Sequence, residues 1–242
     1  MLLIDDASPD PEVHQVLRTW QGRVGPRWRF LRNRDNLGFV ATANRGMERC
    51  DGDVVLLNSD TEVTSGWLEG LARCLASEPS IGTATPWTNN GEIASLPRFC
   101  AVNPVPADPE AVAAVIADCG PPQYPEIPTA VGFCMAIPRR AIERVGPFDE
   151  QRFGKGYGEE NDFSMRLREA GMRNVLCDDV YVVHLGGRSF GPLGLRPGED
   201  SMQRLLALHP GYLDLVRKFI DADPLQARRQ AIVDALARAG LG

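Results

Sequence analysis

The sequence predicts an α/β domain in which a mixed, mainly parallel sheet is flanked by helices. Short apolar runs such as Asp53–Leu57 alternate with segments of helical periodicity such as Pro11–Trp20. Polar clusters follow the apolar runs directly, as turns follow buried strands. With 242 residues, the chain is long enough to bury a core without disulfide bonds or a structural metal.

The first strand and helix are predicted at the very start of the sequence. Met1–Ile4 is a short apolar run, and the polar residues 5–10 after it indicate a buried strand that ends in a turn. From Pro11 to Trp20 the apolar residues Val13, Val16 and Leu17 have helical spacing, and a proline is favourable in the first turn of a helix.

The same order of strand and helix repeats as far as residue 86. We expect a strand at Trp28–Leu31, then the turn residues 33–38, which open a helix to about Cys50. Asp53–Leu57 is the most apolar run and is typical of a parallel strand buried on both faces. Trp67–Ser77 is predicted as the next helix and Ile81–Pro86 as the next strand, so the order is that of a doubly wound sheet.

The middle of the chain is rich in proline and irregular. Pro86–Pro128 contains one predicted helix, Pro109–Cys119, and we interpret this segment as an excursion over the mouth of the sheet. Loops of this kind often select substrates.

Regular elements return after residue 128. We expect a strand of small residues at Thr129–Ile137, a short helix at Pro138–Val145 and an acidic helix at Glu159–Ala170 that ends at Gly171. Two short strands follow at Asn174–Leu176 and Val180–His184, and residues 199–242 are expected to be mostly helical.

Composition argues against several classes of partner. The formal net charge of −6 disfavours binding to nucleic acid. The six cysteines include no C-x-x-C pair, so a reducing cytoplasm is the simplest location. We expect neither a leader nor a membrane span, because no apolar run approaches the roughly 18 residues that a span needs. The stripe Leu225, Ile232, Val233 and Leu236 either packs on the domain or makes a peripheral contact with the inner face of the membrane.

Polar groups suited to ligand binding follow three predicted strands. They are Asp5–Asp6, Asn58–Ser59–Asp60 and His184. Ligands bind at the carboxyl ends of strands in open α/β sheets, so these groups can share one crevice. Asp60 and His184 are too few for a closed protein site but suit Mg²⁺ or Mn²⁺ completed by phosphate oxygens and water. Singly, each has an ordinary alternative, a turn cap for aspartate or a structural hydrogen bond for histidine.

Three acidic residues, Glu159, Glu160 and Asp162, begin the acidic helix. Acidic side chains in a first turn are stabilised by the helix dipole and need no further role. On the other hand, neighbouring carboxylates raise each other's pKa into the range of a general base, and Phe163 and Leu167 anchor the helix start. We therefore expect this cluster to supply the catalytic residues.

From Leu2 to Phe190 the chain resembles the family 2 glycosyltransferases of the GT-A (Rossmann-like) fold, in particular bacterial rhamnosyltransferase-like enzymes of surface polysaccharides. The matching motifs occur in the family's order: Ile4–Ser8, Asn36–Phe39, Ala43–Gly46, Leu57–Asp60, Gly146–Glu150, Tyr157–Asp162 and Val183–His184.

The resemblance implies roles for particular residues. Asp60 and His184 would be the metal ligands and Glu160 the base, with Asp162 a second acidic position. The donor nucleotide would lie among Asp5, Asp6, Asn36, Gly38, Asn44, Asn58 and Asp60. Asn58 departs from the family's D-x-D element, but the second aspartate is the one that coordinates.

The resemblance also implies that the sheet has an open edge. The family's opening strand, its proline-aromatic-asparagine turn and the following helix have no counterpart here, so we expect an uncovered edge beside Met1–Ile4 and self-association through it.

The predicted function is a metal-dependent, inverting transfer of a sugar from a nucleotide-diphospho-sugar to a hydroxyl of a glycan or lipid-linked acceptor. Residues 1–198 would form the catalytic domain, with a nucleotide-sugar half to about residue 86, an acceptor half from about residue 87 and a helical appendage at 199–242. A non-catalytic nucleotide-sugar or glycan binder is the first alternative. A phosphohydrolase ranks last, because no nucleophile or second metal cluster is evident.

Overall fold

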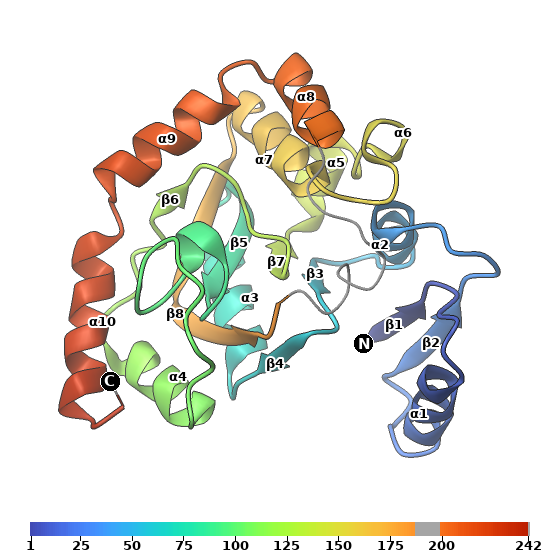
Figure 1. Ribbon diagram of the computed structural model, residues 1–242, viewed down its shortest axis with the longest axis horizontal. Helices are drawn as coiled ribbons and strands as arrows, with labels where there is room; N and C mark the ends of the chain where they lie inside the picture. Colours follow the sequence, from blue (N-terminus) through green and yellow to red (C-terminus); the bar gives the residue numbers. More distant parts are fainter. Residues whose placement is uncertain (187–198, 242) are drawn as a thin grey trace.

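The computed structural model describes residues 1–186 and 199–241, so the predicted boundary at residue 198 lies outside the described residues. A sheet with helices on both faces forms the centre of the molecule, and a smaller unit built from the first residues lies at one side (Figure 1). The predicted α/β class is confirmed.

The central sheet has six strands. Its order is β3-β7-β5-β8-β4, and β6 pairs with β8 as a branch. The strands are β3 (Val54–Leu57), β4 (Thr61–Val63), β5 (Ile81–Trp87), β6 (Glu126–Ile127), β7 (Cys134–Ile137) and β8 (Arg173–His184). Within this sheet only β5 and β8 are parallel. The expected predominance of parallel pairing was wrong, since hydrophobic periodicity identifies a strand but not its direction.

The two faces of β7 face different layers, as the alternation of side chains along a strand requires. Met135 and Ile137 pack in a cluster with helices α2 (Phe39–Met47), α5 (Arg139–Val145) and α7 (Glu159–Glu169). Cys134 and Ala136 pack in a second cluster with α3 (Trp67–Ser77). The sheet is therefore covered on both faces, and β5 and β7 are buried along their whole length.

Strand β8 is continuous where the sequence suggested two strands. Asp178 and Asp179 lie in its middle, and the pairing with β5 shifts there, from Pro86 opposite Cys177 to Trp87 opposite Tyr181. Asp178 accepts the backbone N–H groups of residues 123 and 124, and Asp179 pairs with Arg73 at 2.9 Å. Because these buried carboxylates have partners, the acidic pair does not end the strand.

The excursion after residue 86 contains short elements that were not predicted. These are the 3-10 turn η1 (Glu92–Ala94) and β6, beside the expected helix α4 (Pro109–Asp118). Helix α6 (Glu150–Phe153) is likewise new. Three or four residues are too few to show helical periodicity, and the two residues of β6 do not form an apolar run.

The C-terminal helices α8 (Glu199–Leu208), α9 (Tyr212–Ala222) and α10 (Gln226–Arg238) run along one side of the domain (Figure 1). Leu225, Ile232 and Leu236 are buried in a third cluster with α4 and Trp87. The suggestion that this stripe meets a membrane was therefore wrong. Within the described residues, no helix combines the length and apolar character that crossing a membrane requires.

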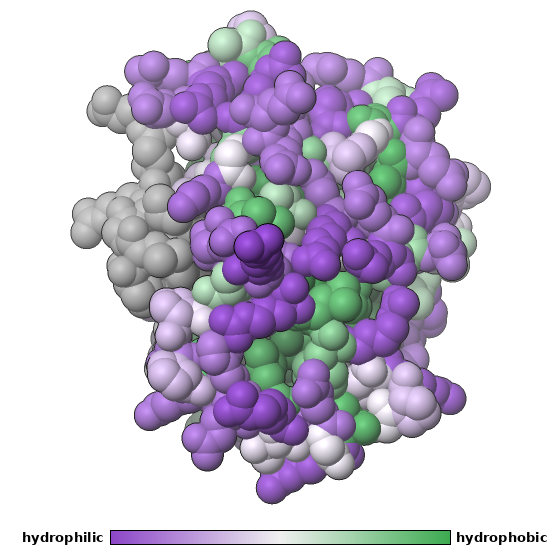
Figure 2. Space-filling model, turned by 90° about the vertical axis from the view of Figure 1, so that its right-hand side faces the viewer, coloured by the Kyte–Doolittle hydropathy of each residue, from purple (hydrophilic) through white to green (hydrophobic). Residues whose placement is uncertain are grey.

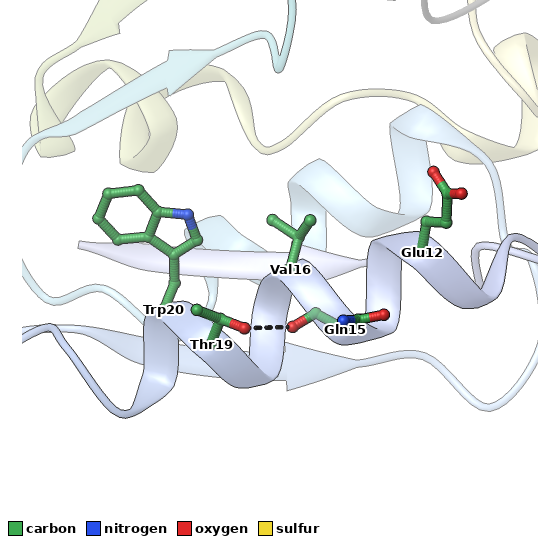
Figure 3. A pocket seen from close by; sticks show the side chains of 5 residues that line it. All are labelled: Glu12, Gln15, Val16, Thr19 and Trp20. Atoms are coloured by element: carbon green, nitrogen blue, oxygen red, sulfur yellow. Dashed lines mark hydrogen bonds between the residues drawn. The ribbon is translucent and has the colours of Figure 1, made fainter.

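The first unit is loosely attached. Strand β1 (Leu2–Asp5) pairs in parallel with β2 (Arg29–Arg32), and within the described chain neither joins the central sheet. Helix α1 (Pro11–Gln21) has no buried residue, and Val16 and Trp20 are 54% and 52% exposed. Figure 3 shows Glu12, Val16 and Trp20 on one side of this helix, and Figure 2 shows apolar surface between hydrophilic side chains on this face of the molecule. Both the second edge of β1 and the outer edge of β3 lack a partner strand in the described structure.

We therefore predict that the chain self-associates through this unit. Unpaired strand edges beside exposed apolar side chains favour pairing between chains. Combining Val16→Lys with Trp20→Glu should shift the chain toward monomer in sedimentation velocity across a range of concentrations. Val102→Glu, at a site 71% exposed in another part of the chain, is the matched control and should have no effect. A wild-type chain that is monomeric at every concentration would contradict the prediction.

Candidate active and metal-binding site

The antiparallel pairing of β4 with β8 brings Asp60 to His184. Thr61 lies opposite His184, and the backbone oxygen of Asp60 accepts the N–H of Leu185 at 2.9 Å. The side chain of Asp60 is buried, and its Oδ2 lies 3.7 Å from Nε2 of His184. These two residues, 124 positions apart by their numbers, meet as predicted.

The surroundings of His184 fix which ring nitrogen is available. Nδ1 lies at hydrogen-bond distance from the backbone oxygen of Asn90, and this oxygen can only accept. Nδ1 therefore carries a hydrogen, and Nε2 is the ring nitrogen that faces Asp60 and can offer a lone pair to a metal ion. Asn89 bonds both the N–H and the C=O of His184, and the ring of Phe133 stacks on the imidazole with centroids 5.2 Å apart.

This pair fits a divalent cation. Oδ1 of Asp60 is buried and has no hydrogen-bond partner among the described residues. A carboxylate oxygen and an imidazole nitrogen are both ligands that divalent cations accept, and metal–ligand bonds of about 2.1 Å can span their separation. The residues that the structure describes include no cluster of three His, Cys, Asp or Glu side chains able to hold a metal, so the remaining ligands would come from a substrate and water.

Asp6 organises the turn between β2 and α2. Its Oδ1 accepts from the side chain of Asn33 (2.7 Å) and from the N–H of Leu37 (2.9 Å), and its Oδ2 accepts from the N–H of Gly38 (2.8 Å). Burial opposes the ionisation of Asp6, but these hydrogen bonds outweigh it and lower its pKa. Asn36 donates to the backbone oxygen of Asp6 in the same turn. Contact of Asp6 and Asn36 with a nucleotide stays a prediction.

Asp5 is buried at the end of β1. Its Oδ1 accepts the N–H of Ser8, and its Oδ2 lies 3.5 Å from Nε of Arg32. Asn58, at the end of β3, bonds through its backbone to Phe133 and Thr61. The structure gives Asp5 an ion-pair partner and fixes the backbone of Asn58 beside the Asp60–His184 pair.

Gly38 allows two loops to meet. Its φ of +88° is left-handed, and a Cβ there would lie 2.7 Å from Cα of Lys155, which only glycine avoids. The N–H of Phe39 also donates to the backbone oxygen of Lys155. Thus the predicted donor-binding turn supports the loop that precedes the acidic helix.

Asn44 does not belong to a nucleotide site. Its side chain is buried and exchanges two hydrogen bonds, each 3.0 Å long, with the backbone N–H and C=O of Phe148. Both ends of the amide are used in joining α2 to the turn before α6. The predicted cofactor contact was wrong, because an internal partner occupies the groups that a ligand would need.

The acidic helix α7 buries Glu159 and half-buries Glu160 at its start. Burial and then the charge of Glu160 raise the pKa of Glu159 to about 8. Burial and then the charge of Glu92 raise the pKa of Glu160. Oε2 of Glu159 has no hydrogen-bond partner in the part of the chain that is described. This pair can hold and exchange a proton near neutral pH.

Asp162 has a different environment from the two glutamates. Its Oδ2 pairs with Nε of Arg166 at 2.8 Å and its Oδ1 with Nε2 of His209 at 2.9 Å, and the side chain is almost fully buried. Both oxygens are used in ion pairs inside the protein. We therefore correct the expected catalytic role of Asp162 to a structural one.

The segment Gly132–Phe133 connects the two halves of the site. A Cβ on Gly132 would lie 3.8 Å from Cγ of Glu160, while Phe133 stacks on His184. The base candidate and the metal-ligand pair therefore flank one dipeptide. No functional signal marks this dipeptide in the sequence. Asn89 and Asn90, which orient His184, follow β5 after Thr88 and form the kind of polar cluster that marked the other strand ends.

Comparisons with known proteins agree with this geometry. The model of the family described as Glycosyl transferase family 2 matches residues 1–146. The Drosophila melanogaster protein described as putative polypeptide N-acetylgalactosaminyltransferase 13 is 37% identical over 91 residues, which are 35% of this chain and 16% of that protein.

Two solved structures share the fold. GalNAc-T7 with UDP, GalNAc and Mn²⁺ matches at a TM-score of 0.60 and 15% identity, over 97% of this chain and 47% of the other. The mannosyltransferase PcManGT from Pyrobaculum calidifontis, in complex with GDP-Man and Mn²⁺, matches at 0.55 and 15% identity, over 99% and 65%. These matches confirm the predicted GT-A class. The chain spans less than two thirds of the length of each relative.

We predict that Glu159→Gln stabilises the protein at alkaline pH. The unfolded chain ionises Glu159 above its ordinary value of 4.5, whereas the folded state keeps the proton up to about 8, so wild-type stability falls as pH rises between these values. The gain in the free energy of unfolding should grow across this window by a few kcal/mol in order of magnitude. Denaturant titrations at several pH values measure it, with the exposed Glu143→Gln as control. A gain that does not depend on pH would contradict the raised pKa.

Proposed function

The chain belongs to glycosyl transferase family 2, and from this membership and the site geometry we propose that it transfers a sugar from a nucleotide-diphospho-sugar to an acceptor hydroxyl with inversion. The observation that carries the proposal is the Asp60–His184 pair, whose imidazole nitrogen and buried, unpartnered carboxylate oxygen fit Mg²⁺ or Mn²⁺. A bound cation would neutralise the diphosphate that leaves.

Glu160 is the proposed base. The acceptor oxygen attacks the anomeric carbon, the bond from that carbon to the phosphate oxygen breaks, and the diphosphate keeps the electron pair. Glu160 takes the proton that the hydroxyl loses. Its raised pKa suits this role, since a base works best when its pKa lies near the working pH. Attack from the side opposite the leaving group inverts the configuration.

Two structural relatives support a proposal for the class of donor sugar. GalNAc-T7 was solved with UDP and GalNAc and PcManGT with GDP-Man, each with Mn²⁺. We propose a hexosyl or deoxyhexosyl donor, with the rhamnosyltransferase-like branch retained as a prediction, and a glycan or lipid-linked acceptor. The six cysteines are all free, three of them buried, which supports the expected cytoplasmic location.

The first test combines binding with turnover. Wild-type protein should bind UDP or GDP only with Mn²⁺ or Mg²⁺ in isothermal titration, and release nucleoside diphosphate from one donor of a UDP- and GDP-sugar panel. Asp60→Ala should lose this metal-dependent affinity, by roughly tenfold or more. Glu69→Ala, at an exposed carboxylate on α3, is the control. Binding without turnover of any donor would favour the non-catalytic alternative, and unchanged affinity in Asp60→Ala would refute the metal site.

The second test concerns the base. Glu160→Gln should lower the turnover number by about a hundredfold or more and leave nucleotide affinity nearly unchanged, because a general base acts on the chemical step. Glu159→Gln should have a milder effect, since Glu159 is the more deeply buried of the two. Equal losses in both variants, or a loss confined to affinity, would show that the acidic pair only caps the helix.

A further inference from the structure

We propose that His209 is a positioning residue, which holds the first turn of α7 and thereby the carboxylate of Glu160. It lies in the corner between α8 and α9, well beyond residue 146, where the match to the family ends. This inference rests on the proposed function for its catalytic meaning, but the contacts that carry it are independent of any substrate.

Helix α7 begins without a cap of its own. Its N-cap is Gly158, which has no side chain and is left-handed at φ +101°. Of the four residues before it, Gly154, Gly156 and Tyr157 also have positive φ. The first turn then contains two carboxylates whose pKa values are raised by burial. The burial of these carboxylates and the left-handed backbone of Tyr157 both oppose this turn, so contacts elsewhere in the fold must offset the cost.

His209 supplies such contacts. Its Nε2 lies 2.9 Å from Oδ1 of Asp162, in the first turn of α7, and its Nδ1 lies 3.0 Å from Oε1 of Glu169, at the end of the same helix. Each ring nitrogen of His209 therefore lies at hydrogen-bond distance from a carboxylate oxygen of α7. The imidazole is buried, and it therefore clamps two points of α7 at once.

Asp162 is also held from its other side. Arg166 pairs with Oδ2 of Asp162 and donates to the backbone oxygens of Val145 and Pro147 at the end of α5. Asp162 thus links the corner at His209 to the α5–α6 turn through the helix that carries Glu160. Removing His209 leaves a buried carboxylate oxygen without its donor.

Tyr212 gives the corner between α8 and α9 a second contact with α7. It packs in the cluster that contains Phe163 of α7 and hydrogen-bonds to Thr129. Next to Thr129, the N–H of Ala130 donates to Ser164, whose hydroxyl donates to the backbone oxygen of Glu160. The corner 209–212 therefore supports both Asp162 and the backbone of Glu160.

Amide hydrogen exchange tests the clamp without any need for turnover. In the full chain, His209→Ala should speed exchange in the first turn of α7 by about tenfold or more, with β5 and β7 unchanged. Glu169→Gln, which removes the partner that is 62% exposed, should change it little. His209→Gln keeps one N–H donor near Asp162 and should fall between wild type and His209→Ala. Unchanged exchange in α7, or an equal rise throughout the sheet, would overturn the proposal.

Kinetics test the link to Glu160. With a donor that wild type uses, His209→Ala should lower kcat by about tenfold while nucleoside diphosphate affinity with Mn²⁺ stays within about twofold. Added to Glu160→Gln, it should cause no further loss, because it acts through that side chain. An additive loss, or unchanged kcat, would overturn the proposal. A wild-type chain that neither binds nucleotide nor uses a donor would refute the proposed function instead, and hydrogen exchange would still judge the clamp.

Discussion

Buried carboxylate oxygens without a hydrogen-bond donor dominate the energetics of this site. Within the described structure they are Oδ1 of Asp60, Oε2 of Glu159 and Oδ2 of Asp5, and the last of these lies 3.5 Å from Nε of Arg32. Burying such groups costs free energy, so a fold that keeps them must offset the cost elsewhere. Glu159 reduces it by keeping a proton, as its raised pKa shows. Asp60 faces an imidazole nitrogen, and a bound cation is the direct compensation. The Glu159–Glu160 pair is thus suited to exchanging protons, and the Asp60–His184 pair to holding a cation.

Hydrogen bonds and ion pairs along β8, the strand that carries His184, help to offset the cost of burying the Asp60 carboxylate. Asn174, near its start, donates to the backbone oxygens of Pro128 and Ser164. Asp178 and Asp179, in its middle, pair with Arg228 and Arg73 at 2.8 and 2.9 Å. Because the polar groups along β8 have partners, its last residue, His184, can be held beside the buried carboxylate of Asp60. The C-terminal helix contributes directly to this support, since Arg228 comes from α10.

Features that depend on the pattern within short stretches of sequence could be predicted correctly. The meeting of Asp60 and His184 followed from their places at strand ends, and the helix Trp67–Ser77 was predicted with its observed bounds. Asn44 and Asp162 could not be assigned correctly, because amide and carboxylate groups serve ligands and internal partners equally well. Their partners, Phe148 and His209, are 104 and 47 residues away in the sequence. The direction of β7 was missed for a similar reason, since it depends on how the long excursion returns to the sheet.

Arg166 and His209 are placed so that they hold the first turn of the acidic helix without lowering the pKa of its glutamates. Arg166 and His209 both bond to Asp162 and, within the described chain, neither bonds to Glu159 or Glu160. A cation paired directly with Glu160 would hold it ionised and lower its pKa, which would weaken it as a base. Because Arg166 and His209 bond to Asp162, two residues further along, they hold the helix without neutralising the glutamates. The C-terminal corner therefore acts at a position where it can order the site and still leave the raised pKa of the acidic pair intact.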